Sequence, residues 1–391
     1  MKKEKLAVVI IFAVFYVIGA AGVYSLLSVL NFSNAAPISP IKFSEEKAKV
    51  STNKALTEEE GPKTEPCPLN GRFYSKKQRE KWEKRRPLGI MVENHKEARP
   101  QSGLQNADVI FEAVAEGGIT RFLAIFYCED ANPVGPVRSA RVYFIRLLQG
   151  FGNYPLYAHV GGANTPGPAD ALGLIRKLGW SRYNDLNQFS VPFPYFWRDY
   201  ERLKGKATEH TVYTSTAKLW QYAEKKRKLT NVDKKGNSWD ESFEPWKFKE
   251  REKVGNIKTI EFGFWSDNPT DPYFVKWEFD EKSKLYKRYN GGKPLIDKNS
   301  GKVLKFKNIA IIFAKESPAN DGYPGGHLLY KIKGSGKALI FFDGQVTKGI
   351  WKKPSYTKQI KFYKKTGEEI IFSRGKVFIE ILPIANKVIY E

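Results

Sequence analysis

The sequence predicts an α/β or α+β N-terminal domain followed by a mainly β C-terminal domain, with one transmembrane helix at the N-terminus. Three observations support this fold class. Strand-like and helix-like segments intermix between residues 86 and 228. Short β-branched and aromatic segments, separated by turn signals, fill residues 259–391. An uncharged stretch of 25 residues, 6–30, precedes both regions.

The uncharged stretch is long enough to cross a bilayer, because a helix rises about 1.5 Å per residue and the hydrocarbon core is roughly 30 Å thick. Lys2, Lys3 and Lys5 precede it, and no Lys or Arg follows until Lys42. This asymmetry predicts a cytoplasmic N-terminus, a single-pass anchor in the cell membrane and an extracytoplasmic body. The alternative is a signal peptide cleaved near Ala35–Ala36. A lipoprotein signal is not expected, because the first cysteine is Cys67.

The remaining chain divides by composition. A linker and a polar, helix-prone lead-in occupy 31–85, the N-terminal domain 86–228, a connector 229–258 and the C-terminal domain 259–391, after the cytoplasmic start and anchor at 1–30. In the N-terminal domain we expect strands and helices separated by Gly and Pro. The strands are predicted at 88–92, 107–115, 120–128 and 155–160, and the helices after an N-cap at Ser139 and at 169–178 and 215–226.

The C-terminal domain is predicted to be mostly β because its short apolar segments alternate with glycine-containing turns. The turns lie at 290–292, 299–301, 343–344 and 366–367. The strands are predicted at 273–279, 285–289, 308–313, 328–332, 338–342, 360–363, 369–372 and 377–381.

The composition favours anionic partners. Lys and Arg number 65 against 42 Asp and Glu, which gives a net charge of +23. The lysines are spread along the chain, so a generally basic surface is the alternative explanation. With two cysteines and four histidines, no metal site is expected, and no cofactor is indicated. The predicted outward topology argues against nucleic acid as a partner. Cys67 and Cys128 form either a disulfide or two unpaired thiols.

Several ordered segments together resemble one family. They are RPLGIMVENH at 86–95, ARPQSGL at 98–104, ADVIFE at 107–112, EGGITR at 116–121 and GPVRSAR at 135–141. These segments are similar to the YerB-like bacterial envelope proteins, which are built from DUF3048 N-terminal and C-terminal domains. The resemblance covers nearly all of 86–385 and implies an envelope location without naming a ligand. Better-known members look like lipoproteins, whereas this chain lacks the lipobox cysteine. Family members often carry a His before the Asp that follows the Asn-Gly turn, where this chain has Lys293 and Leu295.

Ten polar residues beside apolar strands are the candidate ligand-binding site. Carboxylates, arginines and a histidine at such positions could hold an anionic or carbohydrate ligand, or provide an acid/base pair. The alternative is a structural network of paired buried charges. Glu116 and Arg121 should face one end of the sheet together if a hairpin turns at Gly117–Gly118. The candidates are Glu93, Asn94, Arg99, Glu112, Glu116, Arg121, Arg138, Ser139, Arg141 and His159.

Other residues point less clearly to a site. His210 and His327 are expected to be isolated structural or surface histidines. Trp239, Trp246, Trp265 and Trp277 could stack on sugar rings if exposed, although core packing is the simpler expectation.

Two functions fit these observations. The first is a membrane-anchored envelope protein that binds a cell-wall polymer, or another anionic or glycan envelope component, through the charged pocket of the N-terminal domain. The second is an extracytoplasmic cell-wall hydrolase or transferase that uses a Glu/His site. The chain has no Gly-x-Ser-x-Gly elbow, since Ser139 lies in Val-Arg-Ser-Ala-Arg, and no other established catalytic motif is present.

Overall fold

The structure is a computed structural model that describes residues 61–391. Within this part of the chain, no helix has the length and apolar character needed to cross a membrane. The span predicted at 6–30, and the linker up to residue 60, lie outside the described residues.

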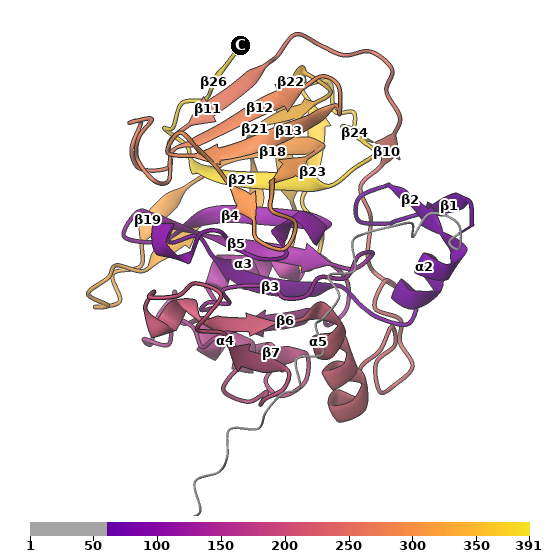
Figure 1. Ribbon diagram of the computed structural model, residues 1–391, viewed down its shortest axis with the longest axis vertical. Coiled ribbons are helices and arrows are strands. Elements are labelled where there is room, and N and C mark those ends of the chain that lie inside the picture. The colour runs from indigo at the N-terminus through magenta and orange to yellow at the C-terminus, as the bar shows by residue number, and fades with distance from the viewer. Residues whose placement is uncertain (1–60) are drawn as a thin grey trace, which may run out of the picture. The chain divides into compact units, whose positions relative to one another are not determined.

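A ten-stranded mixed sheet is the centre of the fold (Figure 1). Its central strands are near-continuous apolar runs such as Ile-Phe and Ile-Ile-Phe, and most of their residues are buried on both faces. In spatial order they are β23 (Lys361–Lys364), β22 (Gln345–Lys353), β21 (Gly334–Phe342), β18 (Asn308–Ala314), β25 (Val377–Pro383), β4 (Val109–Glu116), β5 (Ile119–Phe126), β3 (Leu88–Glu93), β6 (Leu156–His159) and β7 (Asp185–Asn187).

The two halves of the sequence share this sheet. The C-terminal strand β25 pairs in parallel with β4, so that Phe378 lies opposite Ile110 and Glu380 opposite Glu112. In Figure 1 the yellow β25 lies directly beside the indigo β4. The ladder of backbone hydrogen bonds is therefore continuous across the two regions that the sequence suggested as separate domains.

A second sheet packs on one face of the central sheet. Its strands alternate between buried and partly exposed residues, as expected for a sheet with one covered face. The rings of Trp277 and Phe306 lie 5.0 and 5.2 Å from that of Phe378 in β25. The strands are β14 (Lys293–Pro294), β13 (Leu285–Asn290), β12 (Val275–Asp280), β11 (Thr259–Phe262) and β26 (Ile389–Tyr390), with β17 (Lys305–Phe306) beside β13. This second sheet covers one side of the central sheet, and we call that side the "sheet face".

The opposite side, which we call the helix face, is covered by α3 (Val142–Leu148) and its neighbours. A side chain at Gly89 would come within 3.0 Å of Leu148 on α3 and of Leu123 on β5, so the strand needs glycine there for the helix to approach. The other helices are α2 (Lys76–Trp82), α4 (Ala171–Lys177) and α5 (Thr216–Tyr222), which η4 (Ala223–Arg227) continues as a π-helical turn.

Short elements complete the described chain. The 3₁₀ turns are η1 (Lys96–Ala98), η2 (Leu104–Asn106) and η3 (Thr208–His210). Five strand pairs lie outside the two sheets: β1 (Lys63–Pro66) with β2 (Phe73–Ser75), β8 (Phe196–Arg198) with β9 (Val212–Thr214), β10 (Phe248–Lys249) with β24 (Phe372–Ser373), β15 (Ile296–Asp297) with β16 (Lys302–Val303), and β19 (Glu316–Pro318) with β20 (Leu328–Tyr330).

The described chain is mostly β with few helices, and the mainly β character predicted for the C-terminal region is confirmed. The predicted N-cap at Ser139 is wrong. Helix α3 begins at Val142 with Arg141 at the cap position, because Ala140 is held extended by a parallel bridge to Gly162. Ser139 therefore lies before the helix, in extended chain.

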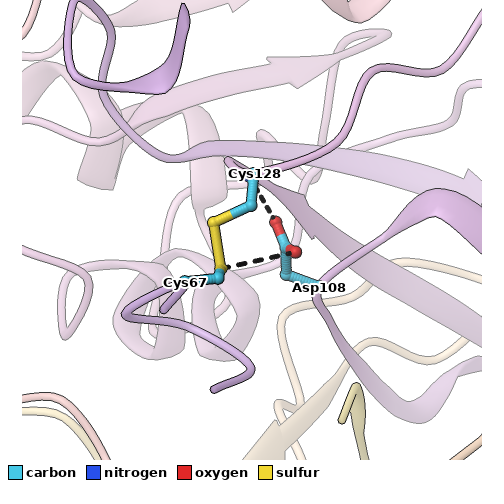
Figure 2. Close-up of side chains that lie close together, drawn as sticks. All are labelled: Cys67, Asp108 and Cys128. Carbon is cyan, nitrogen blue, oxygen red and sulfur yellow. Dashed lines mark hydrogen bonds between the residues drawn. A yellow bond between two sulfur atoms is a disulfide. The ribbon is translucent and has the colours of Figure 1, made fainter. Parts of the chain in front are cut away.

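A disulfide joins Cys67 in the lead-in to Cys128 just after β5 (Figure 2). The buried carboxylate of Asp108 accepts hydrogen bonds from the backbone of Tyr127 (2.7 Å) and Cys128 (2.9 Å) and from Asn70 (2.6 Å). The Cys67 sulfur lies 3.8 Å from this carboxylate, but a disulfide sulfur carries no hydrogen to donate. Burial raises the pKa of Asp108 to about 6. Because both sulfurs are consumed by the disulfide, Cys67 and Cys128 do not provide thiolate ligands for a metal.

Candidate functional site

Two groups of parallel strands in the central sheet end at the same edge. Strands β18, β25 and β4 are parallel, and so are β3, β6 and β7. Because β5 is antiparallel to both β4 and β3, the two groups run in the same direction. In open α/β sheets, ligands bind outside the carboxyl ends of the parallel strands. Of the predicted site residues, Glu93, Glu116 and His159 end β3, β4 and β6 at this carboxyl edge.

On the helix face of the carboxyl edge, two arginines share one carboxylate. Arg121 donates to Glu116 Oε1 at 3.0 Å and to the carbonyl of Ser139 at 3.0 Å, while Arg141 pairs with Glu116 Oε2. The predicted hairpin turns at Gly117–Gly118, both with positive φ, and a bulge between Val114 and Glu116 shifts Glu116 onto the face of Arg121. Glu116 and Arg121 therefore meet at one end of the sheet, as the sequence predicted.

We call Glu116, Arg121, Arg141 and Tyr157 the arginine cluster. The side chains of Arg121 and Arg141 are only 3% and 5% exposed, and burial lowers the pKa of both guanidinium groups. Burial also raises the pKa of Tyr157, against the opposing effect of the two arginine charges. The Nε atoms of both arginines and the Tyr157 hydroxyl are buried without a hydrogen-bond partner. Such groups cost about 1–3 kcal/mol each, so native proteins leave few of them.

A second group surrounds Glu93. Its carboxylate contacts His210 Nδ1 at 2.8 Å, and His210 stacks on His95 with the ring centroids 5.2 Å apart. Arg138 Nε lies 3.1 Å from the other oxygen of Glu93 but makes no hydrogen bond in this position. The expectation that His210 is isolated is therefore wrong. His327 is not isolated either, because it contacts Asp321 at 2.7 Å.

His159 is completely buried at the end of β6. Its Nε2 lies 2.6 Å from Asp185 Oδ1, and its Nδ1 lies 2.6 Å from the carbonyl oxygen of Gly161. Both ring nitrogens are thus engaged by acceptors, and the ring packs against Tyr157 with the centroids 4.8 Å apart and the planes tilted by 34°. In this arrangement, His159 orders the end of the strand next to the arginine cluster.

On the sheet face, Glu112 lies in a network closed off by the second sheet. Arg288 of β13 pairs with both Glu112 and Glu380, and all three side chains are completely buried. Trp277 donates to Glu380 at 3.0 Å. Burial and the neighbouring Glu112 charge raise the pKa of Glu380 well above its usual value, against the effect of Arg288. We call Glu112, Arg288 and Glu380 the buried triad.

Two more predicted site residues belong to this side. Asn94 donates to Glu112 Oε1 (3.1 Å) and to Thr120 (2.7 Å). Arg99 donates to the Asn94 side chain (2.9 Å) and to the carbonyl of Pro272 (2.8 Å). Asn94, Arg99 and Glu112 therefore connect the two sheets, while the other predicted residues gather on the helix face or at the ends of β3 and β6.

Exposed aromatic side chains lie near the carboxyl edge. Trp265 is 52% exposed and lies against Gly118 in the hairpin turn, and Phe189 is 77% exposed beside Gly161. Tyr323 is 43% exposed and is close enough to influence the pKa of Arg121 and Arg141. Trp239, Trp246 and Trp277 are buried in the core. Of the four tryptophans considered from the sequence, only Trp265 is exposed for stacking.

Comparisons with known proteins agree on one family. Residues 75–230 match the N-terminal domain, and residues 264–379 the C-terminal domain, of a family described as a protein of unknown function, DUF3048. The chain is 31% identical over 310 residues to the putative lipoprotein YerB of Bacillus subtilis (strain 168), covering 78% of this chain and 84% of YerB. The crystal structure of Bacillus subtilis YerB is also similar, at 30% identity and a TM-score of 0.67, and the match covers 83% of this chain and all of that one.

Proposed function

This chain belongs to the DUF3048 family of YerB-like proteins, and from that membership we propose that it is an envelope protein with its body outside the cell membrane. We further propose that the arginine cluster binds an anionic cell-wall polymer. The relative in Bacillus subtilis is named a putative lipoprotein, which supports an envelope location. The disulfide between Cys67 and Cys128 supports an oxidising compartment outside the cytoplasm.

The anchor is proposed to be the uncharged stretch at 6–30 rather than a lipid. The first cysteine of the chain is Cys67, which is bonded to Cys128 and therefore does not carry a lipid. Protease added to intact cells should digest the C-terminal half of the body. Protection in intact cells, with digestion after lysis, would contradict the proposed topology.

The unpartnered buried donors of Arg121 and Arg141 carry the binding proposal. Two cations face a single carboxylate, so the arginine cluster retains a positive excess. Glu116 is 23% exposed, more than either arginine, and its carboxylate occupies the position that a ligand carboxylate or phosphate would take between them. An incoming anion would displace Glu116 toward solvent. It would then accept hydrogen bonds from the Nε donors of the two arginines, which Glu116 leaves unsatisfied.

The surroundings favour a polymer as the ligand. Trp265, Phe189 and Tyr323 provide exposed rings near the same edge, and such rings stack on sugars. The net charge of +23 favours a polyanion over a neutral glycan. We favour binding over hydrolysis or group transfer, because His159 is buried with both nitrogens engaged and Glu112 is covered by the second sheet. Neither group is free to act as an exposed acid or base.

A wall-binding experiment tests this proposal. The full chain in detergent should be retained on Bacillus subtilis walls at low salt and released at high salt, since the contacts are between charges. Walls extracted with hydrofluoric acid, which removes phosphodiester-linked polymer, should retain much less protein. The Arg141→Gln variant should bind about tenfold more weakly, because it loses one charge-assisted contact. The matched control is Arg176→Gln, which removes an arginine that is 66% exposed and lies on α4.

Retention that is equal for both variants, or no retention at low salt, would end the binding proposal. If acid-extracted walls retain the protein equally well, the ligand is the glycan rather than the phosphate polymer.

The Glu116→Gln variant distinguishes a ligand site from a structural ion-pair network. If Glu116 competes with the ligand, removing its charge should strengthen wall binding about tenfold, although it weakens two ion pairs. A network with only a structural role predicts lower stability and no gain in affinity. Binding isotherms on the same walls, with thermal unfolding measured in parallel, separate the two results.

A further inference from the structure

A cavity of about 450 Å³ lies on the sheet side of the molecule, between the loop after β3 and the end of β13. Its volume falls within the range of small-molecule sites, roughly 300–1,000 Å³. Three cationic residues line it: Lys96, Arg99 and Lys293. Among the described residues that line this cavity, none is an aspartate or glutamate. The cavity is therefore cationic without an internal counter-charge.

An unsatisfied amide also lines the cavity. Asn290, the last residue of β13, is 4% exposed, and its Oδ1 accepts a hydrogen bond from Arg288 at 3.2 Å. Its Nδ2 is buried without a partner. The chain turns directly after Asn290, where Gly291 has a φ of +53° and a Cβ would lie 2.8 Å from the carbonyl oxygen of Asp271. Asn290 thus presents one unused donor.

Arg99 is held in place by neutral acceptors. Its three nitrogens donate to the side chain and carbonyl of Asn94 and to the carbonyl of Pro272. These bonds use three of the five guanidinium hydrogens, and none of them goes to a carboxylate. Burial lowers the pKa of Arg99 to about 10, so the group stays charged at neutral pH. Two of its hydrogens make no hydrogen bond, and its charge has no ion-pair partner among the described residues.

The rest of the lining is apolar. Pro100, Pro272, Pro294 and Leu295 form part of the wall. A ligand that satisfies the cavity therefore needs an anionic head for the cations and the Asn290 amide, and an apolar body for the prolines.

We propose that this cavity is a second binding site, distinct from the arginine cluster, and that it takes a small organic anion with an apolar body, such as an aryl phosphate. The site combines Lys96, Arg99 and Lys293 with the unused Nδ2 of Asn290. It lies on the sheet side, whereas the arginine cluster lies on the helix face, so the two sites can be removed separately.

Isothermal titration calorimetry of the full chain in detergent, with 1-naphthyl phosphate as the probe, tests this site. Neutral 1-naphthol reports the contribution of the apolar body alone, and inorganic phosphate that of the head alone. Lys293→Met removes one exposed cation, and Asn290→Asp replaces the free donor by an acceptor while keeping the oxygen that Arg288 needs. Lys302→Met is the matched control, because Lys302 is exposed and does not line the cavity.

We expect 1-naphthyl phosphate to bind at least tenfold more tightly than 1-naphthol or phosphate. Lys293→Met and Asn290→Asp should each weaken binding about tenfold, the effect of one lost charge-assisted contact. Lys302→Met should leave it unchanged. No binding at millimolar probe, equal binding of 1-naphthol, or equal affinities in all variants would overturn the proposal. Lys293→Met alters an exposed side chain, so the test does not depend on the folding of Asn290→Asp.

Discussion

Replacing Arg288 by Met should lower the free energy of unfolding by about 4 kcal/mol, because removing one partner of a buried ion pair typically costs 3–5 kcal/mol. The variant leaves Glu112 and Glu380 facing each other, completely buried, without a cation between them. Urea denaturation of the full chain in detergent, followed by tryptophan fluorescence, measures the loss. A loss below about 1 kcal/mol would mean that Arg288 does not hold the two sheets together in the way inferred here.

Glu380→Gln is the matched control for that experiment. Gln keeps the oxygen that accepts from Trp277 and Arg288, and its NH₂ replaces an oxygen that has no hydrogen-bond partner. The variant should therefore stay within about 1 kcal/mol of the wild type at neutral pH.

The pH dependence of these two proteins has a definite sign. The raised pKa of Glu380 means that the folded protein keeps a proton that the unfolded chain has lost. The wild type therefore loses stability from this group as pH rises above the unfolded value of about 4.5 toward the folded pKa. Since Gln does not titrate, the free energy of unfolding of the Glu380→Gln variant should rise relative to that of the wild type over this pH interval. An unchanged difference between the two proteins across this pH range would contradict the assignment.

Removal of the disulfide is the second large effect. Cys67 and Cys128 are separated by 61 residues, and the loop-entropy relation gives about 4 kcal/mol for a closed loop of that length. The Cys67→Ser, Cys128→Ser double variant should lose this amount in urea denaturation. The reduced wild type serves as its control, since it loses the same cross-link without a change in side-chain volume. If the oxidised wild type and the double variant unfold at the same urea concentration, Cys67 and Cys128 are not paired in the protein.

Local features of the fold could be predicted from the sequence. The hairpin of β4 and β5 is encoded by two apolar runs around Gly117–Gly118, and this turn places Glu116 and Arg121 at the same end of the sheet. Strand β22 was missed, because Gln345–Lys353 contains three lysines and a glycine, and most of its residues are only partly buried. Its strand conformation comes from pairing with β21 and β23 on either side.

The long-range contacts were not predictable in the same way. Arg288 lies 176 residues from Glu112 and 92 from Glu380, and no periodic pattern links positions so far apart. The cue for Glu112 was a single carboxylate in an apolar strand, which requires a partner but does not identify it. The parallel pairing of β25 with β4, which joins the two family regions in one sheet, is likewise a contact between segments far apart in the sequence. The turn residues and apolar runs gave no sign of it.

The candidate site was predictable as a list of residues but not as an arrangement. Three of the ten predicted residues, Asn94, Arg99 and Glu112, lie on the sheet side, and the side on which a residue lies depends on register. The bulge before Glu116 changes that register by one position and brings Glu116 to the arginines. Tyr157 and Asp185 were missed, because they are ordinary residues of apolar or short strands and become notable only through their neighbours.

The most direct test of the ligand role of the arginine cluster is a crystal structure of the full chain soaked with a glycerol phosphate oligomer. A phosphate group should lie about 3 Å from both Arg121 and Arg141, with the Glu116 side chain rotated outward into solvent. A fully soaked crystal in which Glu116 still pairs with both arginines, and no phosphate lies between them, would contradict the account.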